Sequence, residues 1–97
     1  MRIEYDEVKN QKNLVKHGLS FQTASSAFND PQSVIIYDEE HSEGEDRYNL
    51  IGAVESHILF IVYTMRGEAV RLISARPATK REIERYYGEE VSLHDQV

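Results

Sequence analysis

The chain has 97 residues, which at the usual size of domains is a single domain with one modest core. It contains no Cys, so disulfides, thiolate metal sites and thiol nucleophiles are excluded. No apolar run is long enough to cross a membrane, and no charged-then-apolar stretch at the N-terminus has the pattern of an export signal. We therefore expect a soluble, cytoplasmic protein without membrane contact.

The charge is unevenly distributed along the chain. The net charge of -6 by itself argues against nucleic acid as a partner, because phosphate contacts need a positive surface. Residues 66–85, however, hold six basic and three acidic side chains, whereas six of the nine residues in 38–46 are acidic. We interpret the acidic stretch as a solvated loop and the basic segment as a candidate anion-binding surface.

The first third of the chain predicts a strand followed by two helices. Polar and apolar residues alternate over 2–5, and Asp6 then caps a helix that ends at Gly18. Ser20 is a second N-cap, and the helix it begins has an apolar stripe that includes Phe21 and Phe28 before Pro31 stops it.

The remainder predicts a meander of four strands and a final helix. Residues 33–38, 47–55, 58–65 and 68–76 are rich in β-branched and aromatic side chains, and the last three are separated by short gaps. Thr79 and Glu82 form a capping box that opens a helix ending at Gly88. We expect an α+β fold over residues 1–88, with helices packed on an antiparallel sheet in the order β-α-α-β-β-β-β-α, and a C-terminal tail over 89–97.

The hairpin turns predict which side chains share a face of the sheet. Two-residue turns at Arg66-Gly67 and Ser56-His57 pair Met65 with Glu68, Val62 with Arg71, Phe60 with Ile73, Thr64 with Asn49, and Arg66 with Arg47. Cross-strand partners point to the same side, so three arginines and Thr64 lie together, while Arg76 emerges on the opposite face beside His57. A bulge forced by Pro77 would bring Arg76 to the others.

Clustered guanidinium groups repel one another unless something negative lies among them. One interpretation is that an acid such as Asp46 or Glu68 neutralises them. The other is that they bind an anionic ligand, for which phosphate is the best match to the forked guanidinium.

Several motifs together carry a family resemblance. They include Asn13-Leu14-Val15-Lys16-His17-Gly18, His41-Ser42-Glu43-Gly44-Glu45-Asp46-Arg47-Tyr48, Tyr63-Thr64-Met65-Arg66-Gly67 and Arg71-Leu72-Ile73-Ser74-Ala75-Arg76-Pro77-Ala78-Thr79. In order and spacing, residues 4 to about 87 resemble the BrnT family of type II toxins. The resemblance implies a RelE-like fold and an endoribonuclease that inhibits translation. It also implies neutralisation by a cognate BrnA-like antitoxin, with operator DNA bound only through that antitoxin.

Metal-independent RNA cleavage needs a base, a cluster of cations and an acid at one place. By position in the family motifs, the candidate catalytic residues are Lys16, His17, Arg47, Arg66 and Arg76. The candidate substrate-binding residues are Thr64, Arg71, Ser74 and Arg81. His17 is the first candidate for acid–base work and His41 the second, because an imidazole titrates near neutral pH. No cofactor or metal is expected.

Alternatives remain open at this point. Lys16 and His17 also suit the last turn of any helix, where cations complement the dipole. His41, Glu43 and Glu45 form a weak candidate metal site. Instead of an enzyme, the chain could be a non-catalytic binding module that joins the antitoxin in a DNA-binding autoregulatory complex, or a structural adaptor.

Overall fold

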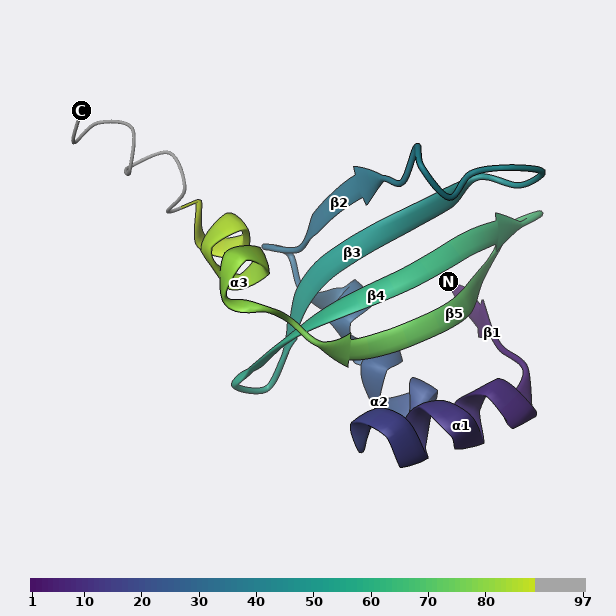
Figure 1. Ribbon diagram of the computed structural model, residues 1–97, viewed down its shortest axis with the longest axis horizontal. Coiled ribbons are helices and arrows are strands. Elements are labelled where there is room, and N and C mark those ends of the chain that lie inside the picture. The colour runs from purple at the N-terminus through teal and green to yellow at the C-terminus, as the bar shows by residue number, and fades with distance from the viewer. Residues whose placement is uncertain (89–97) are drawn as a thin grey trace.

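The computed structural model, which describes residues 1–88, is a five-stranded sheet with helices on one face and at one end (Figure 1). The strands are β1 (Arg2–Glu4), β2 (Val34–Tyr37), β3 (Arg47–Val54), β4 (His57–Arg66) and β5 (Ala69–Pro77). Their order in the sheet is β1-β5-β4-β3-β2. The predicted tail over 89–97 lies outside the described residues.

The helices begin and end at the predicted caps. They are α1 (Glu7–His17), α2 (Phe21–Ala24) with its 3₁₀ continuation η1 (Ser25–Asn29), and α3 (Lys80–Tyr87). The side chain of Asp6 accepts from the Val8 amide and that of Ser20 from the Thr23 amide, while Thr79 and Glu82 form the capping box. The α+β fold class and the element order are therefore confirmed.

The sheet contains one parallel pair besides the three antiparallel ones. Residues 2–4 of β1 run parallel to residues 69–71 of β5. Hairpin turns force consecutive strands to be antiparallel, but β1 and β5 are far apart in sequence and no turn joins them. The sequence therefore holds no local signal for the direction of this pair.

The core lies between the sheet and α2 with η1. It contains Phe21, Ala24 and Ala27 from the helices and Leu50, Leu59, Ile61, Tyr63, Val70, Leu72 and Ala75 from the strands. Gly52 lets η1 approach β3 closely, since a Cβ there would lie 2.8 Å from Leu50 and 3.1 Å from the Ala27 carbonyl. These contacts use one face of the sheet. On the other face α3 packs over one end, where Ile51 is buried, and the rest of that face is open.

Both predicted hairpin registers are wrong, because each turn lies one residue away from its predicted position. The turns are Gly67-Glu68 and Glu55-Ser56, where Gly67 and Glu55 have φ of 60° and 56°. The observed pairs replace the predicted ones: Arg47 faces Thr64, Asn49 faces Val62, Thr64 faces Arg71, and Met65 faces Val70. Moving a two-residue turn by one position moves each partner by two, which keeps every side chain on its predicted face.

A β-bulge corrects the prediction for Arg76. Tyr63 pairs with Leu72 and Val62 with Ser74, so Ile73 is the extra residue on β5. Beyond the bulge, Phe60 faces Arg76 instead of Ile73. Arg76 is thus on the same face as Arg47 and Arg71, and the bulge that brings it there lies at Ile73 and not at Pro77.

Candidate active site

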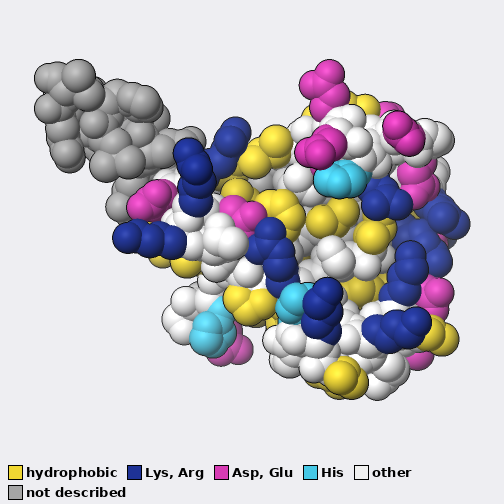
Figure 2. Space-filling view, in the orientation of Figure 1, with side chains coloured by type: hydrophobic (Ala, Val, Ile, Leu, Met, Phe, Trp, Pro, Cys, Tyr) yellow, Lys and Arg dark blue, Asp and Glu magenta, His cyan; other side chains and the backbone are white. Residues whose placement is uncertain are grey.

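The open face of the sheet collects the predicted polar side chains. Because of the register and the bulge, it carries Arg47 and Asn49 from β3, Thr64 and Arg66 from β4, and Arg71, Ser74 and Arg76 from β5. Figure 2 looks onto this face, where Lys and Arg side chains surround an apolar centre and His and acidic side chains of the β2–β3 loop lie along its upper border.

A hollow of about 440 Å³ lies at the middle of this face. Its lining consists of Asp38, Glu40 and His41 from the β2–β3 loop, and Arg47, Asn49, Phe60, Val62, Ile73, Ser74 and Arg76 from the sheet. The lining therefore combines apolar side chains with two arginines, two carboxylates, an amide, a hydroxyl and an imidazole. An apolar lining with a few convergent polar groups is the usual form of a ligand site.

Arg47 and Asn49 have unused hydrogen-bonding capacity in this hollow. Arg47 Nε and Asn49 Oδ1 are buried and make no hydrogen bond within the described residues. Within that part of the chain, Glu45 is the acid within ion-pair distance of the Arg47 guanidinium, at 3.9 Å, and because both side chains are partly exposed the pair is weak. Buried polar atoms normally have partners, so this pair of atoms suits a ligand with both acceptor and donor groups.

Arg76 is held rigidly at the opposite wall. Its guanidinium lies 4.2 Å from the centre of the Phe60 ring and donates two hydrogen bonds to Glu82, at 2.8 and 2.9 Å. The hydrogen bonds to Glu82 raise the pKa of Arg76, which keeps it charged. The ion pair anchors α3, and the same side chain lines the hollow.

His41 and Asp38 form a pair on the rim. His41 Nδ1 lies 3.0 and 3.1 Å from the two Asp38 oxygens, and the Asp38 carboxylate also accepts from the His41 amide. A carboxylate on one ring nitrogen fixes the tautomer and leaves Nε2 for chemistry. The side chain of His41 is 61% exposed, so a substrate has access to it.

The remaining open-face residues lie nearer the β4–β5 turn. Arg71 pairs with Glu4 of β1 at 3.5 Å, and Arg66 is exposed at the end of β4. Thr64 is buried, and its hydroxyl donates to the Asp46 carbonyl, which holds the start of β3 in place. Ser74 lines the hollow itself, whereas Arg81 lines a neighbouring groove with Arg85 and Phe60.

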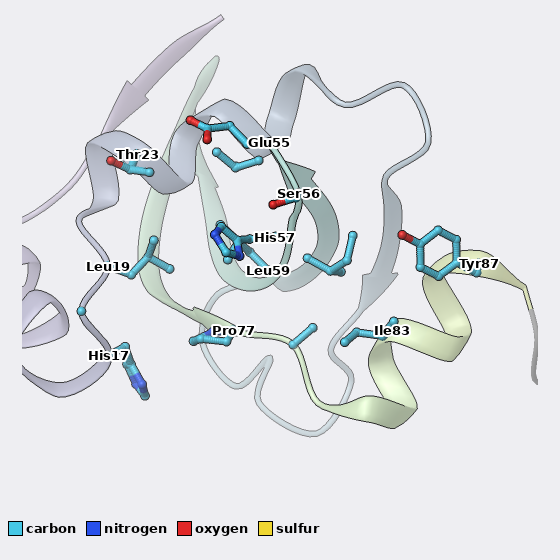
Figure 3. Close-up of a pocket in the computed structure, with 14 residues that line it drawn as sticks. His17, Leu19, Thr23, Glu55, Ser56, His57, Leu59, Pro77, Ile83 and Tyr87 are labelled. Carbon is cyan, nitrogen blue, oxygen red and sulfur yellow. The ribbon is translucent and has the colours of Figure 1, made fainter.

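Lys16 and His17 are placed elsewhere. They end α1, and His17 lines a separate, largely apolar pocket of about 610 Å³ with His57, Leu59 and Pro77 (Figure 3). Neither residue lines the hollow that Arg47 and Arg76 share.

Asp38, Asn49 and Phe60 line the hollow but are not among the predicted site residues. In the sequence, Asp38 is one of six acids in the loop over 38–46, and only its spacing of three residues from His41 indicates that the two side chains could pair. Asn49 and Phe60 alternate with core residues along their strands, so only the three-dimensional sheet shows that they face a ligand-sized hollow.

A family model supplies the decisive comparison. The model for the ribonuclease toxin BrnT of type II toxin–antitoxin systems matches residues 5–82. The chain belongs to the BrnT family. The match contains α1 and all of β2–β5, and it ends at Glu82, the residue that holds Arg76. A type II toxin of this description has RNA as its substrate and an antitoxin as its partner.

No curated protein sequence matches the chain closely enough to count as a relative. None of the helices in residues 1–88 is long and apolar enough to cross a membrane. Within the same residues, no three His, Asp or Glu side chains gather in a group that could hold a metal ion.

Proposed function

We propose that this BrnT-family chain is a RelE-like, metal-independent endoribonuclease that cleaves RNA in the hollow on the open face of its sheet. Cleavage in the cytoplasm would arrest translation, and a BrnA-like antitoxin would neutralise the toxin and bind operator DNA for both. The observation that carries the catalytic part is the convergence of Arg47, with its unpaired Nε, and Arg76 on one hollow.

Cleavage requires stabilisation of negative charge and two proton transfers within the hollow. The RNA 2′-oxygen attacks the adjacent phosphorus, a bond from phosphorus to that oxygen forms, and the bond to the 5′-oxygen breaks. Arg47 and Arg76 stabilise the negative charge that builds up on the phosphorane oxygens. One proton must leave the 2′-hydroxyl and one must reach the departing 5′-oxygen.

For proton transfer we favour His41, because it lines the hollow and Asp38 orients its ring. His17 and Lys16 stay candidates on the strength of the motif, at the end of α1. Asn49 and Ser74 would hydrogen-bond the nucleotide at the cleavage site, and the half-buried Phe60 side chain would offer it an apolar surface.

The flanking RNA would follow the basic residues to both sides. Arg66 and Arg71 lie toward the β4–β5 turn, and Arg81 lies on α3 in the groove that shares Phe60 with the hollow. Thr64 supports the strand start that carries Arg47. This path crosses an electropositive strip of a protein that is acidic overall.

The test is incubation of the purified chain with naked RNA in excess EDTA. The proposal predicts cleavage products with 2′,3′-cyclic phosphate and 5′-hydroxyl ends, since attack by the 2′-oxygen produces those ends. The double variant Arg47→Ala/Arg76→Ala, prepared in the same way, controls for contaminating nucleases. Intact RNA in the presence of folded protein that still binds the antitoxin would favour the non-catalytic binding module instead.

A further inference from the structure

Helix α1 has an inverted amphipathic pattern. Its two buried residues are Asn10 and Asn13, whereas Val8 and Val15 are 62% and 87% exposed. A surface helix normally points its apolar residues at the core. Here the apolar residues lie on the side that faces away from the protein.

Hydrogen bonds of the two asparagines attach α1 to the rest of the protein in place of an apolar helix face. Asn13 donates to the carbonyls of Leu19 and Ala75 and accepts from the Ala75 amide, which fixes α1 to the free edge of β5. Asn10 accepts from the Phe21 amide. The fold therefore has no need of the two valines, and nothing in the described residues covers them.

Charge lies directly beside the exposed valines. Val8 and Val15 are two helical turns apart and point the same way, with Lys12 between them. Lys9 and Lys16 flank the same side, so three lysines form a stripe next to the valines on a helix with one acid, Glu7. In a chain of net charge -6 this is a local basic surface.

We propose that the outward face of α1 is the surface on which the antitoxin docks, through an amphipathic segment that carries apolar and acidic side chains side by side. This proposal rests on the proposed function for the existence of a protein antitoxin. Valines that leave water on binding supply affinity, and the facing charges set the orientation and the rate of encounter. The surface is distinct from the hollow, so the antitoxin can hold the toxin without occupying the cleavage site.

The test uses the full-length chain and its cognate antitoxin, with binding measured by calorimetry and kinetics by surface plasmon resonance. Val8→Ala/Val15→Ala is expected to weaken binding at least about tenfold, since each change removes apolar surface from the contact while alanine favours the helix. Lys9→Glu/Lys12→Glu is expected to slow association and reduce its salt dependence. Ile35→Ala, which shortens an aliphatic side chain on β2 that is 56% exposed, is the matched control and is expected to bind normally.

Measuring RNA cleavage by each variant distinguishes a failure of the docking surface from a failure of the ribonuclease assignment. Normal cleavage with weakened antitoxin binding supports the docking surface. Wild-type affinity in both α1 variants overturns it and leaves the ribonuclease assignment intact. A wild-type chain that fails to bind the antitoxin overturns the docking surface together with the antitoxin part of the proposed function.

Discussion

The Arg76 side chain both stabilises the fold and lines the candidate active site. Its guanidinium packs on Phe60, pairs with Glu82 and borders the hollow. Glu82 in turn accepts from the Thr79 amide and so caps α3. The ion pair that anchors α3 and the proposed contact with RNA phosphate therefore involve the same side chain.

The pair also predicts a dependence of stability on pH. Partial burial raises the pKa of Glu82, but hydrogen bonds from Arg76 and from the Thr79 amide outweigh it, so the net pKa lies below the ordinary value of 4.5. A lowered pKa means that the folded state binds fewer protons than the unfolded state. The stabilisation is thus present above about pH 5 and is lost as the pH falls through the folded-state pKa.

Glu82→Gln is expected to flatten this dependence and to cost under about 1 kcal/mol at neutral pH, since the pair is only partly buried and glutamine can still cap the helix. Urea unfolding at pH 7 and at pH 4 measures both effects. Glu84→Gln on the same helix is the control, because Glu84 makes no ion pair within residues 1–88. Equal loss of stability on acidification in wild type and Glu82→Gln would contradict the assignment.

The two histidines differ in position, and this predicts different kinetic effects. His41→Ala is expected to lower the rate of the cleavage step about a hundredfold, the usual size of a general acid–base contribution. His17→Ala should lower it far less, because His17 lines the other pocket. Single-turnover rates across a range of pH measure both variants. A large loss in His17→Ala with a small one in His41→Ala would transfer the role to His17.

At the scale of elements, the sequence predicts correctly those features that depend only on residues close together in the chain. Asp6, Ser20 and Thr79 cap the helices that they precede, as predicted. The β3–β4 turn lies one residue from its predicted position because Glu55 adopts a positive φ, which is uncommon for a residue other than glycine and has no signal in the sequence. In the β4–β5 turn the positive φ is at Gly67, so there the sequence does hold a signal, a glycine at the first turn position. The bulge at Ile73 depends on the opposite strand, so the sequence alone could not place Arg76.

The attachment of α1 gives a stability prediction. Asn13→Ala leaves the Ala75 amide and two carbonyls without their partner in a buried place, and it is expected to destabilise the fold by about 2–3 kcal/mol. Lys12→Ala on the exposed side of the same helix should change the free energy of unfolding by less than about 0.5 kcal/mol. Urea denaturation compares the two, and similar values for both would show that these hydrogen bonds do not hold the helix.

At the scale of the whole molecule, arginines gather on one face of the sheet although the chain as a whole is acidic. The chain carries -6, yet Arg47, Arg71 and Arg76 share one face of the sheet. The family resemblance and the charge distribution predicted a basic surface, and the fold class followed from the order of elements. The composition of the hollow could not be predicted, because it depends on how the β2–β3 loop returns over the sheet.

RNA binding is therefore expected to be strongly dependent on salt. Three phosphate contacts to single-stranded RNA give a slope of about −2 in log K against log salt concentration. Titration of a 2′-O-methyl RNA, which cannot supply the attacking hydroxyl, measures binding without cleavage. A slope near zero would mean that the arginines do not contact phosphates.

In the proposed mechanism, Arg47 and Arg76 stabilise the transition state of RNA cleavage. The most direct measurement is the single-turnover cleavage rate of Arg76→Ala at saturating protein, beside Arg2→Ala as an exposed arginine outside the hollow. We expect a loss of about a hundredfold, near 3 kcal/mol, for Arg76→Ala in protein that unfolds cooperatively, and a normal rate for Arg2→Ala. Cleavage by folded Arg76→Ala at a rate close to wild type would contradict it.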